Sequence, residues 1–212
     1  MRLTIDEAEK MMRENDGNLD LRDTEFKELP QNLVVKGYLD LSGTQIESLP
    51  KNLKVDGSLY LNDSQIKSLP ENMTIGGDLG LRSTQITSLP KNMTFNGSLD
   101  LSNTQITSLP EYLSVAGSLD LSGTQITNLP EHLTVGDRLD LRHTQIKYVP
   151  DSLIVGGNLD LSNTQVKNLP ENLTIGGALV LSDPPIEYFV VGDSLNLNRT
   201  LIEKKKLKKS KD

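Results

Sequence analysis

The sequence predicts a β-rich solenoid, a chain that winds through many similar turns and lays a parallel sheet along one side. Eight of its ten prolines stand twenty residues apart, from Pro30 to Pro170, without a slip. Around each of them the same unit recurs, G-x-L-x-L-x-x-T-Q-I-x-x-L-P-x-N-L-x-V-x. Only 4% of the 212 residues are aromatic and none is tryptophan, so a large conventional core is not expected. Self-similarity at a fixed period is the signature of stacked repeats.

The turn at residues 117–136 shows how each unit is built. Its first two leucines alternate with polar residues, as in a strand with one buried face. The isoleucine and the leucine before Pro130 break that alternation, so the chain turns there, and the proline excludes a helix interior. A last leucine and a valine then alternate again. The unit predicts six inward apolar positions, here Leu119, Leu121, Ile126, Leu129, Leu133 and Val135.

Two further positions of the unit are predicted to have structural roles. Gly117 opens the unit, and aspartate replaces it at Asp137 and Asp193, which predicts a backbone with positive φ at this position. Threonine stands at the eighth position of most units, for example at Thr124. Its hydroxyl can bond a backbone group that is left open where the chain leaves the strand.

The sequence divides into three segments. Residues 1–16 are expected to form an N-terminal capping helix, and residues 17–202 the repeat solenoid. The solenoid comprises eight full twenty-residue units, a short unit at 177–192 and a partial unit at 193–202. Residues 203–212 are expected to be a basic, disordered tail, because they hold six lysines against two acids.

Both ends of the solenoid carry signals of a cap. Thr4 and Glu7 have the spacing of a capping box, and Gly17 is the expected C-terminal stop of a helix over 4–16. Near the other end, the segment Asp183-Pro184-Pro185 replaces the ordinary turn, and proline cannot donate to a strand ladder. Regular stacking is therefore expected to end there. The apolar stripe of the helix is Ile5, Ala8, Met11 and Met12.

Composition excludes several kinds of site. The chain has no cysteine, and so no disulfide, thiolate zinc site or cysteine nucleophile. No apolar run approaches the roughly 18–20 residues that span a membrane, and the acidic N-terminus lacks the pattern of a signal peptide. We therefore expect a cytoplasmic protein that uses no cofactor. The net charge is −7, and because the tail is basic the rest of the chain is more acidic still.

The motif L-x-L-x-x-T-x-I-x-x-L-P resembles the leucine-rich repeat, L-x-x-L-x-L-x-x-N-x-L. The period of twenty and the Leu-Pro pair are similar to the short bacterial type found in effector proteins of enteric pathogens and in repeat proteins of gut bacteria and phages. The resemblance covers about residues 17–202. It implies a right-handed, leucine-rich-repeat-like solenoid whose concave parallel sheet binds proteins and whose repeats carry no catalysis.

Two departures from the family pattern bear on the geometry of each turn. The asparagine of the family is threonine here, with Ser64 and Pro184 as exceptions. The first leucine of the family falls on Ala116 or Lys36, and an apolar residue such as Val115 stands one place earlier. A flatter turn, closer to that of a β-helix, therefore remains an alternative.

The outward residues of the strands form the candidate binding face. A column of aspartates recurs in the LDL segments and is interrupted at Tyr60 and Gly80. Tyr38 and Tyr60 are outward aromatics on adjacent rungs, flanked by Arg22 and Arg82, and tyrosine and arginine are enriched at protein interfaces. A second break from consensus places two arginines on one rung. The candidate partner-binding residues are Asp20, Arg22, Tyr38, Asp40, Tyr60, Arg82, Asp100, Asp120, Arg138, Asp140, Arg142 and Asp160.

The repeated aspartate has several explanations. Carboxylates about 4.8 Å apart on successive rungs repel each other by on the order of 1 kcal/mol in water. Duplication of one ancestral unit accounts for the repetition without any function. An acidic stripe that attracts a basic protein surface is the main functional alternative. Cation bridging and a glycosidase pair are weaker, because Ca²⁺ takes roughly six to eight oxygens and a glycosidase needs two carboxylates in unlike environments.

Three function classes follow. The first is a non-enzymatic module whose sheet face binds an unidentified protein, for which a basic surface would suit the aspartates. The second is an acidic decoy that mimics nucleic acid and occupies a basic site on a host enzyme, as a phage inhibitor does. The third is a carbohydrate-active β-helix. We expect no metal, small-molecule substrate or membrane contact, and direct nucleic-acid binding only through the lysine-rich tail.

Overall fold

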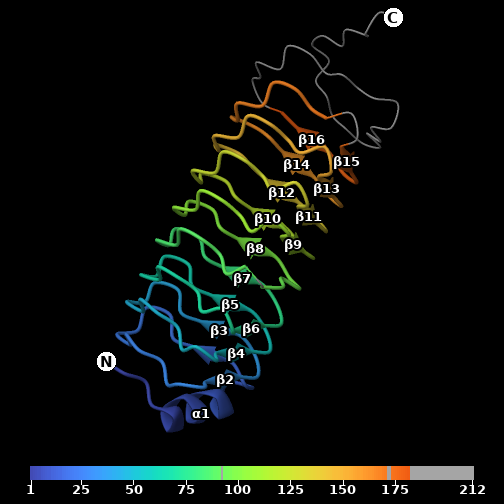
Figure 1. Cartoon of the computed structure of the whole chain (residues 1–212). Coiled ribbons are helices and arrows are strands. Elements are labelled where there is room, and N and C mark those ends of the chain that lie inside the picture. Colours follow the sequence, from blue (N-terminus) through green and yellow to red (C-terminus); the bar gives the residue numbers. More distant parts are fainter. Residues whose placement is uncertain (92, 171–172, 182–212) are drawn as a thin grey trace, which may run out of the picture.

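A computed structural model describes residues 1–91, 93–170 and 173–181. One N-terminal helix is followed by a stack of similar turns that runs along one axis away from the helix (Figure 1). The predictions for Asp183-Pro184-Pro185, for Asp193 and the units after residue 181, and for the basic tail lie outside the described residues.

Helix α1 spans Ile5–Glu14, and its start is the predicted capping box. The backbone N–H of Glu7 donates to Thr4 Oγ1 at 3.3 Å, and the backbone N–H of Thr4 donates to Glu7 Oε2 at 2.9 Å. At the other end, the N–H of Gly17 donates to the Met12 carbonyl at 2.8 Å, and Gly17 has a φ of 84°. The helix therefore stops close to the predicted glycine.

The apolar stripe of α1 is predicted correctly at three of its four positions. Ala8 is buried, and Met11 and Met12 pack against the core, but Ile5 is 42% exposed. Leu3 is fully buried instead; it precedes the helix, and its N–H donates to the Glu28 carbonyl at 3.0 Å. Among the described residues, no helix has the length and apolarity needed to cross a membrane.

The main sheet has nine parallel strands, each contributed by the LDL segment of one turn or its equivalent. Every strand pairs with the residues twenty positions away, so that Leu119 faces Leu139 and Asp120 faces Asp140. In order across the sheet the strands are β1 (Leu19–Asp20), β3 (Leu39–Asp40), β5 (Leu59–Tyr60), β7 (Leu79–Gly80), β8 (Leu99–Asp100), β10 (Leu119–Asp120), β12 (Leu139–Asp140), β14 (Leu159–Asp160) and β16 (Leu179–Val180).

A second parallel ladder runs along the stack and is divided in two. The division falls between Ile75 and Phe95, where phenylalanine stands at a position that neighbouring turns fill with valine or isoleucine. One part is formed by β2 (Val34–Val35), β4 (Lys54–Val55) and β6 (Thr74–Ile75). The other is formed by β9 (Ser114–Val115), β11 (Thr134–Val135), β13 (Ile154–Val155) and β15 (Thr174–Ile175).

The core is a column of identical positions between the two ladders. All six inward positions predicted for the turn at 117–136 are buried, and Leu119, Ile126 and Val135 are fully so. Burial of one such side chain contributes roughly 1.5–3 kcal/mol, and only neighbouring turns can provide it. Ala116 and Lys36 are exposed, so the shift of one apolar position away from the family pattern is real.

The prediction of positive φ at the first glycine of the unit is wrong for Gly117. Among the described residues of that column only Gly17 has a positive φ. Gly117 is small for another reason: an added Cβ would lie 2.6 Å from Ser98 Oγ and 2.9 Å from the carbonyl carbon of Gly97. The glycine allows close approach of the rung before it, where a side chain needs local adjustment.

Positive φ occurs instead at the seventh position of the unit, between the second leucine and the threonine. Asp, Asn and Gly predominate there, the residue types that best tolerate the left-handed region. Their φ values lie between 55° and 71°, at Asp23, Gly43, Asp63, Ser83, Asn103, Gly123, His143 and Asn163.

The threonine that follows this residue has the predicted structural role. Thr124 is fully buried, and its Oγ1 donates to the Leu121 carbonyl at 2.7 Å. Its backbone N–H donates to the same carbonyl at 3.2 Å, which closes the turn as the chain leaves the strand. Thr44 and Ser64 repeat the contact one rung apart.

Candidate functional site

The aspartates of the main sheet all make the same local contact. In each LDL segment the carboxylate accepts a hydrogen bond from the backbone N–H two residues later, where the strand ends. In the turn at 117–136, Asp120 Oδ1 accepts from Ser122 N–H at 2.8 Å. The other five bonds are 2.9 to 3.2 Å long and involve Asp20, Asp40, Asp100, Asp140 and Asp160. The repeated aspartate therefore has a structural role in every turn that carries it.

The outward residue before each aspartate links neighbouring rungs. Asp78 Oδ1 accepts from the backbone N–H of Ser98 at 2.7 Å, and Ser98 Oγ accepts from Ser118 N–H at 3.1 Å. Asn158 Oδ1 makes the same bond to Ala178 N–H at 2.7 Å. Arg138 has no side-chain acceptor, and the acceptor of Tyr38 lies at the far end of its ring, so the two consensus-breaking residues give up a bond between rungs.

A compact ion cluster lies on β12 and β14. The side chain of Asp140 is 4% exposed, and its Oδ2 accepts hydrogen bonds from Arg142 Nη2 and Arg138 Nη2, each at 2.7 Å. Arg138 Nη2 also lies 3.3 Å from Asp160 Oδ2, and Arg142 Nε lies 3.6 Å from the same atom. Two arginines thus balance two aspartates, and this end of the column is neutral.

The charge balance determines the pKa of Asp140. Burial would raise the pKa, but hydrogen bonds from Arg142 and the charge of Arg138 outweigh it, so the pKa lies below the ordinary value. The bond to Asp140 in turn raises the pKa of Arg142. Both groups are therefore held in their charged forms.

A second ion group lies at the first two rungs. Arg22 Nη2 contacts Asp20 Oδ2 at 2.6 Å, and Arg22 Nε lies 3.4 Å from Asp40 Oδ2. The hydrogen bond from Arg22 lowers the pKa of Asp20. One arginine thus serves two aspartates, which leaves this group with one negative charge.

Two tyrosines adjoin this group on the sheet face. The ring centroids of Tyr38 and Tyr60 lie 6.5 Å apart with the ring planes tilted by 57°. That geometry is an attractive one for aromatic pairs. The structure therefore brings together five of the predicted residues at the N-terminal end of the face: Asp20, Arg22, Tyr38, Asp40 and Tyr60.

The interruption at Gly80 has a structural explanation. Asn62, on the rung before, reaches across, and its Oδ1 accepts from Arg82 N–H at 3.0 Å. An added Cβ on Gly80 would lie 2.9 Å from that oxygen. Asn62 thus does for this rung what the aspartate does in the others. The Arg82 side chain pairs with Asp63 at 3.6 Å, away from the aspartate column.

The aspartates without an ion pair lie in the middle of the column. Asp100 and Asp120 form no ion pair with any residue that the structure describes, and Asp100 is further bonded by Ser102 Oγ at 2.6 Å. Over the whole described face, seven aspartates stand with four arginines. No group of three metal-ligating side chains was found within residues 1–91, 93–170 and 173–181.

The prediction did not single out two exposed tyrosines on the turns. Tyr112 and Tyr148 are 74% and 71% exposed, and Tyr112 stacks on His132 with centroids 5.2 Å apart. Both lie outside the strands, where most turns carry asparagine or serine at the equivalent positions. The departure of both tyrosines from the residue types of their columns is a signal that the sequence already carries.

No protein-family model matches the chain, and no curated protein matches it. Solved structures do. YopM from Yersinia enterocolitica WA-314 superposes with a TM-score of 0.55 and 24% identity, over 84% of this chain and 40% of that one. YopM of Yersinia pestis, described as a leucine-rich effector protein, gives 0.52 and 18%, over 86% and 56%. The chain has the leucine-rich-repeat fold.

The resemblance found in the sequence is thus confirmed for the fold. Within this leucine-rich-repeat fold the predicted residues form three groups on the main sheet: the tyrosine and Arg22 group, the pair Asp100 and Asp120, and the cluster around Asp140. Arg82 stands apart from them. The chain spans 40% and 56% of the two YopM chains, each of which is longer.

Proposed function

We propose that the chain is a non-enzymatic protein-binding module and that it binds its partner through the outward face of the nine-stranded sheet. The observation that carries the proposal is the pair Tyr38 and Tyr60, with centroids 6.5 Å apart on adjacent rungs of that face. Asn18 Oδ1 on the rung before accepts from the backbone N–H of Tyr38 at 3.0 Å, whereas the Tyr38 side chain makes no such bond to the next rung, so the tyrosine costs the fold a hydrogen bond.

The composition of this region is that of an interface centre. Tyrosine and arginine supply most of the large binding contributions at protein interfaces, and they work best when surrounded by groups that exclude water. Arg22 extends from the same end of the face and is 58% exposed on its side chain. A partner that covered the two rings would also reach this guanidinium. Leucine-rich repeats of effector proteins are the structural neighbours of the chain, which supports the same class of function.

The free carboxylates of Asp100 and Asp120 favour a second candidate, the acidic decoy. Regularly spaced negative charges imitate phosphates only where they are not neutralised. Arg138, Arg142 and Arg22 neutralise much of the column on either side of these two residues. The charge pattern therefore supports a basic patch on a protein partner better than it supports imitation of a long nucleic acid.

The carbohydrate-active alternative receives less support. A glycosidase needs one carboxyl group with a raised pKa to act as the acid. The pKa of Asp140, the most buried aspartate of the face, is lowered. The cytoplasmic location expected from the sequence remains part of the proposal.

Affinity capture tests the proposed binding face. Wild-type chain and the double variant Tyr38→Ala, Tyr60→Ala are immobilised, and retained lysate proteins are quantified by mass spectrometry. The matched control is Tyr112→Ala, Tyr148→Ala, which removes two exposed tyrosines outside the sheet. We expect the partner to be lost by roughly tenfold or more with the first variant and kept with the control. Equal capture by all three chains would contradict the sheet-face proposal.

A further inference from the structure

The second ladder has an open edge beside the N-terminal helix. Within each continuous part of this ladder, the backbone N–H at the outward position and the N–H two residues later donate to the preceding rung. Lys54 N–H donates to the Leu33 carbonyl at 3.1 Å, and Asp56 N–H donates to the Val35 carbonyl at 2.9 Å. Strand β2 is the first strand of this ladder, so its own N–H groups face a rung that supplies no strand.

The groups left open on β2 are the N–H of Val34 and the N–H of Lys36. They correspond to Lys54 and Asp56 one rung later, yet neither donates to any residue within the described part of the chain. The corresponding segment of the first turn, residues 13–16, contains the end of α1 and cannot pair as a strand. Strand edges with open donors are the places where another extended chain pairs.

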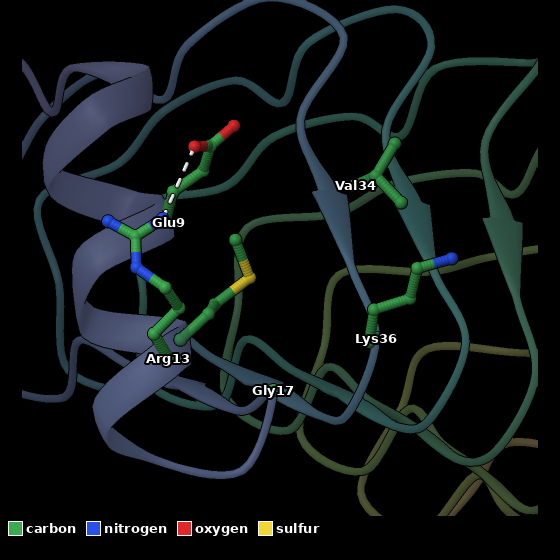
Figure 2. A pocket seen from close by; sticks show the side chains of 6 residues that line it. Glu9, Arg13, Gly17, Val34 and Lys36 are labelled. Carbon is green, nitrogen blue, oxygen red and sulfur yellow. Dashed lines mark ion pairs between the residues drawn. The ribbon is translucent and has the colours of Figure 1, made fainter.

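A cavity of about 330 Å³ that is widely open to solvent occupies this space between α1 and β2. Glu9, Arg13, Gly17, Val34 and Lys36 surround it, with Glu9 and Arg13 on the helix and Val34 and Lys36 on the facing side (Figure 2). Met12 also lines the cavity. Val34 is 40% exposed, so the cavity combines apolar surface with a free strand edge.

The rim of the cavity is positively charged in an otherwise acidic protein. Arg13 and Lys36 are 69% and 71% exposed on their side chains. Glu9 pairs with Arg13 at 3.6 Å, and Asp56 is shared by Lys36 at 3.4 Å and Lys54 at 3.2 Å. Among the residues that line the cavity, two cations, Arg13 and Lys36, stand with one acid, Glu9.

We propose that this groove binds an extended acidic peptide segment of a partner protein, which adds itself to the ladder as a parallel strand beside β2. The peptide backbone accepts hydrogen bonds from Val34 and Lys36, its apolar side chain contacts Met12 and Val34, and its carboxylate meets Lys36 and Arg13. Strand addition gives affinity through the main chain and specificity through alternate side chains. The site is separate from the sheet face that carries Tyr38 and Tyr60.

A displayed library of random seven-residue peptides tests the proposal. The library is first depleted on Val34→Pro, a change that removes one open N–H, and then selected on the wild-type full chain. We expect acidic peptides that bind wild type roughly tenfold more tightly than the variant. Amide exchange of Val34 and Lys36 should slow when such a peptide is added. A library that yields no peptide dependent on Val34 would overturn the proposal.

Charge reversal provides a second arm that does not depend on proline. Lys36→Glu should weaken the selected peptides by roughly tenfold, whereas the matched control Lys147→Glu, at an exposed lysine of another turn, should leave them unchanged. Equal loss in both variants would contradict the site. So would dimerisation of wild type, but not of Val34→Pro, in sedimentation, because a second copy would then be the occupant. The double variant Tyr38→Ala, Tyr60→Ala should bind these peptides normally.

Discussion

The guanidinium of Arg142 donates two parallel hydrogen bonds to the carboxylate of Asp140, from Nε to Oδ1 at 2.9 Å and from Nη2 to Oδ2 at 2.7 Å. This is the bidentate geometry in which arginine holds a carboxylate most firmly. The two residues are two positions apart, so the pair stabilises the backbone at the end of β12. Arg138 adds a third contact to the same carboxylate. The cluster is therefore first a stabilising element of the sheet face.

Replacing Asp140 by asparagine should destabilise the fold by about 1–3 kcal/mol at neutral pH, because two arginines lose a shared charged acceptor. The measurement is the free energy of unfolding from urea titration. The matched control is Asp120→Asn, where the amide oxygen can still accept from Ser122 N–H and no arginine of the described residues is hydrogen-bonded to the side chain. A loss as large in Asp120→Asn would contradict this interpretation of the cluster.

Stability should also fall in acid, and Asp140 should account for part of the fall. Its folded-state pKa lies below the ordinary value of 3.8, so its contribution is complete above that pH and is lost as the pH falls through the folded-state pKa. Urea titrations of wild type and Asp140→Asn over this range should show a smaller acid loss in the variant. Parallel curves would show that Asp140 is not responsible.

The backbone contact of the aspartates predicts a difference between two substitutions at one site. Asp120→Ala removes the acceptor of Ser122 N–H and should cost about 0.5–1.5 kcal/mol. Asp120→Asn should cost less, because its oxygen keeps the bond and the repulsion from the unpaired Asp100 is relieved. The measurement is the free energy of unfolding of each variant, compared with that of wild type. If alanine were as stable as asparagine, the contact would have no energetic weight and duplication alone would explain the repeat.

The exchange of roles between Asn62 and Gly80 can be tested by rescue. Asn62→Ala leaves Arg82 N–H without its acceptor and should cost about 0.5–1.5 kcal/mol. Adding Gly80→Asp in that background should restore the loss, because the new carboxylate can accept from Arg82 N–H as in the other rungs. A double-mutant cycle of unfolding free energies measures the coupling. Strict additivity would contradict the shared role.

Salt distinguishes the two candidate functions once a partner is in hand. An interface centred on Tyr38 and Tyr60 should keep its affinity within a few-fold between about 0.05 M and 0.3 M salt. An acidic decoy should lose affinity steeply over the same range, since its binding depends on unscreened charge. Titration calorimetry at both salt concentrations gives the comparison. A steep loss that Asp100→Asn, Asp120→Asn abolishes would favour the decoy.

The sequence by itself determined the repeat, its period and the buried positions. Spacing of leucine and proline is sufficient for this, because each turn can bury its apolar residues only against an identical neighbour. It also identified the column of Thr124 and the consensus-breaking tyrosines. These are features that a local pattern carries.

The tertiary structure decided what the outward residues do. From the sequence alone, the aspartate column is a row of unpaired negative charges, because the positions of the arginine side chains are not known. In the structure Arg138 and Arg142 pair with Asp140, whereas Arg82 pairs with Asp63. In the structure, positive φ occurs at the residue before the threonine and not at Gly117. The N–H groups of Val34 and Lys36 remain without an acceptor among the described residues, beside α1. Side-chain direction and the partner of each backbone group depend on contacts between rungs, which a periodic sequence does not specify.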